Sequence, residues 1–273
     1  MDHRADGALH GERRPRVRTW RRTLRALALT GRARDAYPGA DAQGVLLPGP
    51  DPAATALRED LGPLAPARLL RPRQGRLGDC WVMAPMLALH ETAPERLRSL
   101  LTGESGGIVC VQLPGVPGPL RVDRRFPVDD RGIFQYGRRD GANPGWVGVL
   151  EKAIAGHVAG DYAYLQRGFA RFGFELLLGE SVHSQLRMPS AAEIIAWRAE
   201  GRAVVASTHP FSARVPSTAG PLPRNHVFAV VGADARSGHV HLRNPVRPST
   251  LLVLDARSFR RGFLSVDVTA PLG

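Results

Sequence analysis

The chain has 273 residues, 43% of them hydrophobic and 23% charged, which is an ordinary composition for a globular protein. This length is enough for one large domain or for two lobes that each have a core. We find no run of the roughly 18 apolar residues that would cross a bilayer, and no apolar segment of a Sec-type signal peptide. These observations exclude a membrane-spanning class and predict a cytoplasmic protein, with export by another route left open.

The net charge of +12 is concentrated at the start of the chain. Residues 1–34 hold ten arginines against three acidic residues, and ten minus three gives +7 there. Abundant Arg, Ala, Gly and Pro with a single Lys is typical of a GC-rich bacterial genome. Codon bias therefore accounts for much of the charge. The alternative is an acidic partner or surface for the Arg-rich start, and nucleic acid is the less favoured form of that partner.

The predicted elements divide the chain into three parts. Residues 1–45 form an Arg-rich extension, disordered in part, with a helical pattern over 17–33. Residues 46–179 form a mainly helical half, and residues 180–273 form a β-rich half. The predicted helices cover residues 80–90, 93–101, 146–158 and 190–200, and the predicted strands cover residues 107–113, 119–123, 132–136, 202–208, 225–232, 239–244 and 250–254. This order predicts an α+β fold with an antiparallel sheet in its second half.

Two cysteines are too few for a disulfide framework, so both are expected to be free thiols. Cys80 follows a loop with glycines at 75 and 78 and begins a helix that is apolar nearly all round. Unpaired N–H groups at a helix N-terminus favour a thiolate, so we expect a lowered thiol pKa there. Cys110 lies in the strand-like run Ile-Val-Cys-Val and reads as an inert core residue. Cys80 is therefore the candidate nucleophile, although a cysteine in this position taken alone is as often structural.

A catalytic thiol needs an imidazole base and a third group that fixes the ring tautomer. Of the nine histidines, His90 is excluded because it lies ten residues along the helix from Cys80, or roughly 15 Å. Surroundings without a suitable strand or partner exclude five more, which are His3, His10, His157, His183 and His209. The remaining His226, His239 and His241 flank a turn sequence that predicts a hairpin.

Side-chain alternation distinguishes the residues of the second hairpin strand. It places Asn244 on an apolar face with Leu242, and His239 and His241 on the opposite, polar face. We expect the two histidines to face solvent, because no third ligand accompanies them for a metal. Asn244 is therefore the candidate orienting residue.

The first hairpin strand carries His226 on the same face as Phe228. A symmetric hairpin would set Asn244 opposite Val227, with His226 facing the other way. We therefore predict a one-residue irregularity between 232 and 239 that sets His226 opposite Asn244.

Four segments resemble those of the calpain family of cysteine proteases. Gln74-Gly-Arg-Leu-Gly-Asp-Cys-Trp81 matches the calpain nucleophile motif at every fixed position. Asn225-His-Val-Phe-Ala-Val-Val-Gly232 looks like the calpain histidine strand, and Leu242-Arg-Asn-Pro245 is similar to the asparagine segment. Trp146 with Val149-Leu-Glu-Lys-Ala153 resembles a helix usual in that family. The likeness covers roughly residues 65–265.

The resemblance implies a papain-like fold of two lobes with the active site in the cleft between them. It implies Cys80 as nucleophile, His226 as general base paired with the thiolate, and Asn244 as the residue that orients the ring. It assigns Gln74 to the oxyanion hole, together with the Cys80 backbone N–H. The implied reaction is hydrolysis of peptide bonds in a protein or peptide substrate through an acyl-enzyme, with no cofactor.

Two positions depart from the calpain pattern. Calpains usually have Trp after the Asn-Pro pair, where the ring shields the His–Asn hydrogen bond, and this chain has Val246. Animal calpains carry an acidic residue of a calcium site three positions before the motif Gln, and this chain has Arg71. Glu151 is kept, but one carboxylate does not make a calcium site. We therefore expect calcium-independent activity, and neither a penta-EF-hand nor a C2-like domain.

Other functions are compatible with the same residues. The Cys–His–Asn geometry can also run acyl transfer, as in transglutaminase-type enzymes. A non-catalytic calpain-like interaction module is a second alternative, which the intact candidate residues argue against. A third is a nucleic-acid-binding arm at residues 1–36 with the core as a passenger. Peptidase activity is the favoured hypothesis, and the sequence leaves open the substrate, the oligomeric state and a role as housekeeping enzyme, toxin or exported effector.

Overall fold

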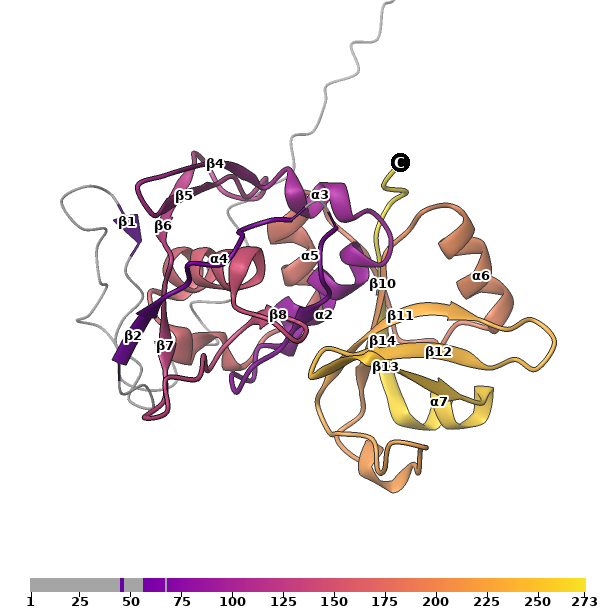
Figure 1. Ribbon diagram of the computed structural model, residues 1–273. Helices are drawn as coiled ribbons and strands as arrows, with labels where there is room; N and C mark the ends of the chain where they lie inside the picture. The colour runs from indigo at the N-terminus through magenta and orange to yellow at the C-terminus, as the bar shows by residue number, and fades with distance from the viewer. Residues whose placement is uncertain (1–44, 47–55, 67) are drawn as a thin grey trace, which may run out of the picture.

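The computed structural model describes residues 45–46, 56–66 and 68–273 (Figure 1). The Arg-rich extension predicted over 1–45, with its helical pattern, lies outside the described residues except for Val45. The described part is a mixed α/β fold in which helices α2 to α5 lie beside small sheets on one side and a six-stranded sheet lies on the other. Within this part, no helix combines the length and apolarity needed to span a membrane.

The first half surrounds a hydrophobic cluster that is built on helix α2. Its helices are α2 (Cys80–His90), α3 (Pro94–Arg98), α4 (Gly145–Ile154) and α5 (Ala170–Leu178), with a π-helical turn at Ala155–Ala159 and a 3-10 helix at Tyr162–Gln166. Its strands are β1 (Val45–Leu46), β2 (Ala56–Glu59), β3 (Pro72–Arg73), β4 (Leu101–Ser105), β5 (Ile108–Val111), β6 (Leu120–Asp123), β7 (Arg125–Val128) and β8 (Arg138–Arg139). One sheet has the order β1-β6-β5-β4, and β2–β7 and β3–β8 form two short pairs.

Helix α2 is buried on all sides, as its apolar sequence predicts. Every residue from Cys80 to Leu89 is buried, including Pro85 in the helix interior. Helix α5 packs so closely that a Cβ on Gly173 would lie 2.2 Å from the Trp81 carbonyl oxygen, so glycine is required there. The Trp81 indole donates a hydrogen bond of 2.6 Å to a carbonyl oxygen of the 3-10 helix. These contacts fix the position of the helix that begins at Cys80.

The second half is organised around one antiparallel sheet of order β13-β12-β11-β10-β14-β9. Its strands are β9 (His183–Gln185), β10 (Val204–Thr208), β11 (Val227–Ala233), β12 (Val240–Asn244), β13 (Arg247–Leu254) and β14 (Phe263–Val268). Its helices are α6 (Ala191–Ala199) and α7 (Ala256–Gly262), with a 3-10 turn at Ser212–Arg214.

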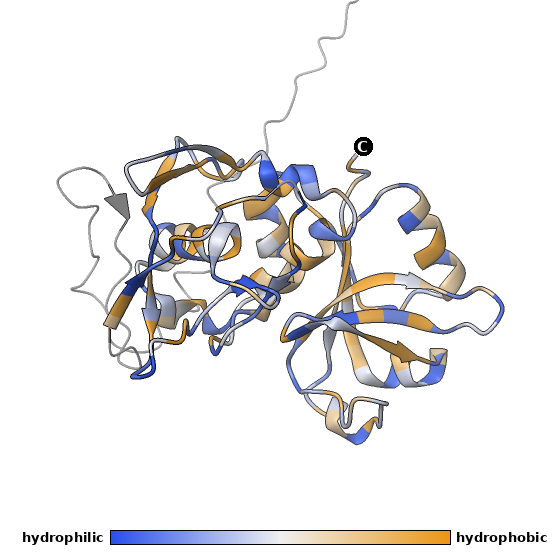
Figure 2. Ribbon diagram, viewed as in Figure 1, coloured by the Kyte–Doolittle hydropathy of each residue, from blue (hydrophilic) through white to orange (hydrophobic). Residues whose placement is uncertain are grey.

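The two faces of this sheet pack against different helices. One face forms a second hydrophobic cluster with Ile194 of α6 and Phe259 of α7. The other face contributes Val205, Val227 and Ala229 to the cluster that surrounds α2. Figure 2 shows the hydrophobic residues running along these strands. The sheet is therefore the surface on which the helix of Cys80 rests.

The strand predicted over 132–136 is wrong. Only an isolated bridge forms there, between Val128 and Phe134. The reason is a turn closed by Asp129, whose Oδ1 accepts hydrogen bonds from the N–H groups of Arg131 and Ile133. A local side-chain acceptor thus replaces the partner strand.

The other predicted helices and strands are confirmed, most with shorter bounds, but several elements were missed. Among them are α5, α7 and β14, and β14 lies inside the large sheet between β10 and β9. Next to the last residue of β14 is a buried Asp267, which accepts a hydrogen bond from the Ser184 hydroxyl on β9. A charged residue at a buried position interrupts the apolar pattern that predicts a strand, and its hydrogen-bond partner lies on a strand far away in the sequence.

Candidate active site

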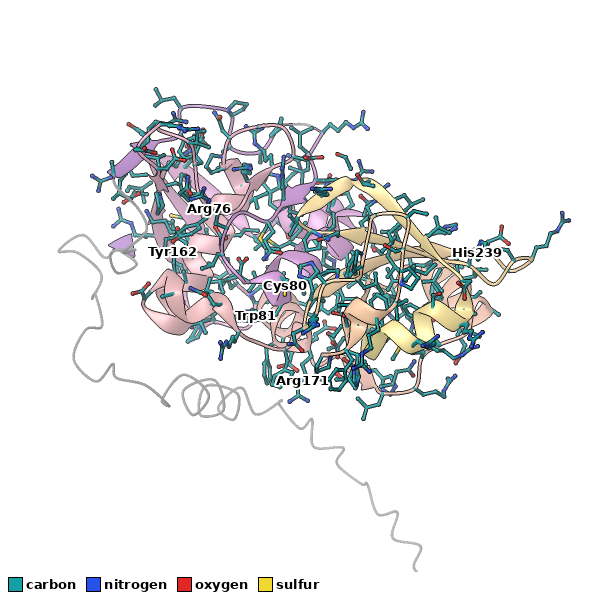
Figure 3. The ribbon with its side chains drawn as sticks, turned by 90° about the horizontal axis from the view of Figure 1, so that it is seen from below. Arg76, Cys80, Trp81, Tyr162, Arg171 and His239 are labelled. Atoms are coloured by element: carbon teal, nitrogen blue, oxygen red, sulfur yellow. The ribbon has the colours of Figure 1, made fainter. Side chains whose placement is uncertain are left out.

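Cys80 is the first residue of α2, at the helix N-terminus that the sequence predicts. The loop before it needs glycine at position 75, because a Cβ there would lie 2.2 Å from the Gln135 carbonyl oxygen. Cys80 is nearly buried, with 9% of the residue exposed. Figure 3 shows Cys80 and Trp81 in the middle of the molecule, where α2 meets the second half. Cys80 therefore lies where both halves can supply partners.

His226 and Asn244 form a hydrogen-bonded pair. Nε2 of the His226 ring lies 2.9 Å from Oδ1 of Asn244. An amide oxygen can only accept, so Nε2 carries the ring proton and Nδ1 of the neutral ring is the free base. The same Oδ1 accepts a hydrogen bond of 3.0 Å from the Val246 backbone N–H, which holds the amide in this orientation.

Thr208 holds the backbone of His226, and sequence reasoning missed it. The His226 N–H donates to Thr208 Oγ1 at 2.9 Å, and the Thr208 N–H donates to the His226 carbonyl oxygen at 2.7 Å. Thr208 is buried at the end of β10, where the pairing with β14 shifts by one residue. A threonine at the end of a strand carries no sequence signal for this role.

An aromatic ring packs next to the imidazole. The buried Phe228 ring meets the His226 ring edge-on, with the centroids 5.2 Å apart. Val246, which stands where calpains usually have Trp, is 38% exposed. One side of the histidine ring is therefore shielded from water by a residue of β11, the strand that follows it.

The β11–β12 hairpin contains a one-residue irregularity, but its predicted location was wrong. Val230 pairs with Leu242 and Gly232 with His241, so the extra residue lies in β11 between 230 and 232. The prediction placed it between 232 and 239. That segment forms a turn closed by its own backbone hydrogen bonds, so the strand absorbs the extra residue instead.

The observed register determines how the two side chains face each other. Continuing it past Val230 sets Asn244 opposite Phe228, two residues from His226. The two site residues therefore share a face, as expected, but as diagonal neighbours and not as the directly opposed pair that was predicted.

Cys80 lies against the strand that follows His226. The backbone N–H of Val227 hydrogen-bonds to the Cys80 sulfur. Because Val227 directly follows His226, the structure brings together the three residues that the sequence singled out.

The electrostatics of this pair differ from the expectation. Burial raises the pKa of the Cys80 thiol to about 11; the Val227 N–H opposes the rise, and the Asp79 charge adds to it. Burial also lowers the pKa of His226, against the opposing effect of the Asn244 hydrogen bond. The lowered thiol pKa expected from the helix N-terminus is wrong, because desolvation outweighs the helix. Both shifts favour a neutral thiol and a neutral imidazole, and not the expected ion pair.

Gln74 is buried in the loop before Cys80. Its Nε2 donates to the Leu77 carbonyl oxygen at 2.6 Å and retains a second N–H. Its backbone N–H donates to the Pro245 carbonyl oxygen at 2.8 Å. The residue expected in the oxyanion hole is thus tied to the residue that follows Asn244.

A pair of buried carboxyl groups lies beneath the start of α2. Asp79 occupies the N-cap position of α2, but its side chain makes no capping hydrogen bond. It faces Glu151 instead, whose two oxygens accept from the Gly137 N–H at 3.1 and 2.9 Å. Burial and the Asp79 charge raise the pKa of Glu151 well above its usual value, and burial raises that of Asp79 to about 7. A proton on Glu151 therefore supplies the donor that the Asp79 oxygens otherwise lack.

Two histidines and the other cysteine, which the sequence does not favour as site residues, lie on strands or next to them. His239 and His241 are half-buried on β12 or next to it. Across residues 45–46, 56–66 and 68–273, no three His, Cys, Asp or Glu side chains gather in a group that could hold a metal ion. Cys110 is half-buried on β5, so its assignment to the core was wrong.

Comparison with known proteins identifies the matched region. Residues 67–248 match the family model described as calpain family cysteine protease. The chain is similar to the calpain-type cysteine protease DEK1 of Arabidopsis thaliana (26% identity) and to the calpain-type cysteine protease ADL1 of Oryza sativa subsp. japonica (27% identity), each over 190 residues. The alignments cover 63% of this chain and 9% of each relative, so the chain spans a small part of the length of these relatives.

Proposed function

Because this chain belongs to the calpain family of cysteine proteases, we propose that it is an endopeptidase in which Cys80, His226 and Asn244 form the catalytic triad. The observation that carries the proposal is the 2.9 Å hydrogen bond between His226 and Asn244, because His226 directly precedes Val227, whose backbone N–H hydrogen-bonds to the Cys80 sulfur. A base with a fixed tautomer beside a thiol at a helix N-terminus is the arrangement that nucleophilic catalysis requires.

The proton path follows from the ring tautomer. As Cys80 Sγ bonds to the scissile carbonyl carbon, the thiol proton moves to Nδ1 of His226, and the imidazolium gives it to the leaving amine when the C–N bond breaks. A water molecule then loses a proton to Nδ1 and attacks the thioester, which releases the acid and restores the thiol. Asn244 carries no charge, so it orients the ring without competing for the proton.

The oxyanion of each tetrahedral intermediate needs donors that are already in place. We assign this role to the Cys80 backbone N–H, at the start of α2, and to the second amide N–H of Gln74. Such donors each typically stabilise the transition state by about 3–4 kcal/mol. The hydrogen bond from the Gln74 backbone to Pro245 supports this assignment, because it ties the donor to the asparagine segment.

The two hydrophobic clusters support a papain-like division into two lobes. In this proposal residues 46–179 form the lobe that carries Cys80, and residues 180–273 form the lobe that carries His226 and Asn244. The substrate would lie between them, because the proposed triad takes residues from both.

Calcium does not fit the position where the resemblance implies a calcium site. Arg71 stands in place of an acidic ligand and is paired with Glu91 at 2.5 Å. Glu151 is buried, faces Asp79 and favours its protonated form, whereas calcium binds ionised carboxylates. We therefore propose a calcium-independent peptidase.

The proposal is tested by hydrolysis of unfolded casein. Wild type is compared with Cys80→Ala, each in the presence of calcium and of a calcium chelator. We expect wild-type cleavage that is equal in both conditions, and a loss of at least about 1,000-fold in Cys80→Ala. Equal activity in the two proteins would end the cysteine-peptidase proposal, and loss of wild-type activity with the chelator would end calcium independence.

A further inference from the structure

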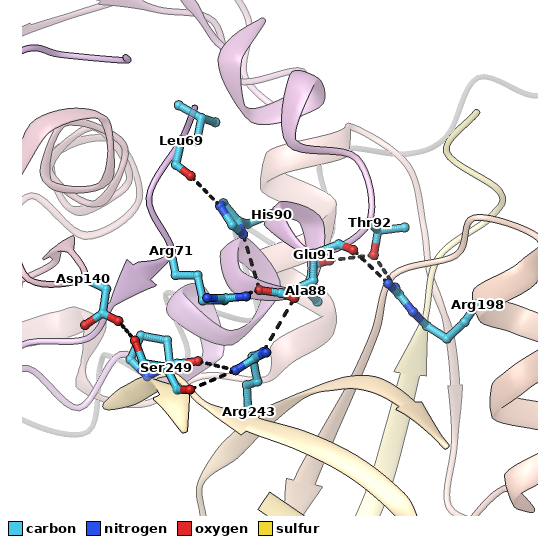
Figure 4. A network of polar contacts seen from close by, with 11 residues as sticks. Leu69, Arg71, Ala88, His90, Glu91, Thr92, Asp140, Arg198, Arg243 and Ser249 are labelled. Carbon is cyan, nitrogen blue, oxygen red and sulfur yellow. Dashed lines mark hydrogen bonds and ion pairs between the residues drawn. The ribbon is translucent and has the colours of Figure 1, made fainter. Parts of the chain in front are cut away.

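A group of charged side chains at the far end of α2 joins the two halves of the molecule (Figure 4). Glu91 directly follows α2, so it lies at the opposite end of the helix from Cys80. Glu91 Oε1 pairs with Arg71 Nε at 2.5 Å, and Glu91 Oε2 lies 3.6 Å from Arg243 Nε. Arg71 belongs to the first half, and Arg243 belongs to strand β12 of the second. One carboxylate therefore ties the nucleophile helix to the sheet.

Arg243 connects Glu91 to the proposed active site. It directly precedes Asn244, and its Nη1 donates to the carbonyl oxygens of Pro248 at 2.9 Å and Ser249 at 3.3 Å. The guanidinium thus spans the turn that begins at Asn244. The Ser249 hydroxyl in turn donates to Asp140 of the first half.

A second arginine of the sheet half holds the same end of the helix. Arg198 of α6 donates a hydrogen bond of 2.9 Å to the Glu91 carbonyl oxygen and another to the Thr92 hydroxyl. Carbonyl groups at a helix C-terminus lack donors within the helix and carry the negative end of its dipole. The second half therefore contacts both ends of α2. Arg198 and Arg243 bind the C-terminal end, and Val227 contacts Cys80 at the N-terminal end.

The charge of Glu91 is retained. Burial opposes its ionisation, but the polar contacts with His90 and Arg71 and the charges of Arg71 and Arg243 outweigh burial and lower the pKa of Glu91 to about 2. Around neutral pH the ion pairs are therefore fully formed.

We propose that Glu91 is a positioning residue, which sets the His226–Asn244 pair in register with Cys80 by holding Arg71 and Arg243 together. The inference rests on the proposed peptidase function. Glu91 lies eleven residues, or about 16 Å, along the helix from Cys80, so it touches none of the reacting atoms. It acts through Arg243 and the turn that carries Asn244. A misplacement of about 1 Å between reacting groups can cost about 100-fold in rate.

The test compares Glu91→Gln with a matched control, Glu95→Gln. Glu95 is an exposed carboxylate on α3 that pairs with Arg98 at 3.0 Å, and it reaches neither the sheet half nor the active site. In Glu91→Gln we expect kcat to fall about 10- to 100-fold while KM changes less than about threefold, because alignment of the reacting groups is lost and substrate contacts are kept. Glu95→Gln is expected to match wild type. Wild-type kcat in Glu91→Gln, or an equal loss in both variants, would overturn the inference.

A second readout does not depend on peptide hydrolysis. The rate of Cys80 alkylation by iodoacetamide near neutral pH, in a Cys110→Ser background, reports how well His226 assists the thiol. We expect it to fall about tenfold in Glu91→Gln, toward the rate of His226→Ala. If wild type proves not to be a peptidase, this rate still decides the inference, and an unchanged rate overturns it. Should Glu91→Gln fail to fold, Arg71→Lys is expected to keep the wild-type rate and Arg71→Gln to lose it; equal rates would contradict the proposal.

Discussion

The buried carboxyl groups at the two ends of helix α2 have their pKa values shifted in opposite directions. At the N-terminal end, Asp79 faces Glu151; burial favours the protonated state of both carboxyls, and the Asp79 charge adds to this effect at Glu151. At the C-terminal end, Glu91 faces Arg71 and Arg243 and stays ionised, although burial opposes its charge as well. Burial alone therefore does not decide the charge of a carboxyl group; the nearest cation does.

This difference has a chemical consequence for the proposed nucleophile. A carboxylate next to Cys80 raises the pKa of the thiol, as Asp79 does. A proton shared between Asp79 and Glu151 limits that negative charge at the end where the thiol must react. The full negative charge of Glu91 is placed at the other end, where it binds the sheet half and is remote from the sulfur.

The largest effect is expected when the C-terminal end is made to resemble the N-terminal end. Arg71→Glu replaces the ion pair with two facing carboxylates. We expect the free energy of unfolding to fall by about 2 kcal/mol near neutral pH, less than for a fully buried pair because the Arg71 side chain is 36% exposed. Urea unfolding measures the change.

The control for Arg71→Glu is Arg187→Glu, which disrupts an exposed pair with Glu193. Exposed pairs contribute about 0–1 kcal/mol, so a smaller loss is expected. Equal losses in the two variants would mean that the charges at the end of α2 are no more important than those on the surface.

A smaller effect, of opposite sign, is expected at the N-terminal end. Glu151→Gln keeps an acceptor for the Gly137 N–H and supplies a permanent donor to Asp79. The folded-state pKa values of both carboxyls are raised, so the wild-type pair loses stability as pH rises from about 4 through about 7. We therefore expect Glu151→Gln to be more stable than wild type by about 1–2 kcal/mol at pH 8, and by much less at pH 5.

Urea unfolding of wild type and Glu151→Gln at the two pH values measures this gain. The exposed Glu95→Gln serves again as the control and should show neither a gain nor a pH dependence. A Glu151→Gln protein that is less stable at pH 8 would show that the carboxyl pair is not strained by its charge.

The candidate site residues could be singled out from sequence because their patterns are local. A glycine loop before an apolar helix identified Cys80, and alternation along β12 separated Asn244 from His239 and His241. The exact register was not predictable, since the first hairpin strand is apolar on both faces and its turn accepts more than one length. The structure shows which register forms, because Val230 pairs with Leu242.

The partners of the site residues lay beyond sequence patterns, for physical reasons. Asp79 reads as an N-cap, yet its side chain faces Glu151, more than seventy residues along the chain. Glu91 reads as an ordinary polar end of a helix, and only the folded chain brings Arg243 to it. The thiol pKa was predicted in the wrong direction because the extent of desolvation depends on how the two halves close over Cys80.

The most direct test of the proposed triad is the pH dependence of alkylation by a peptide chloromethyl ketone, with the modified residue mapped by mass spectrometry. We expect one adduct on Cys80 and none on Cys110. The rate should rise as His226 loses its proton, at a pH below the usual histidine pKa of about 6.5, and then stay level to about pH 9, because burial lowers the His226 pKa and raises the Cys80 pKa. An adduct on Cys110, or a rate that follows an ordinary free thiol near pH 8.5, would contradict the proposed triad.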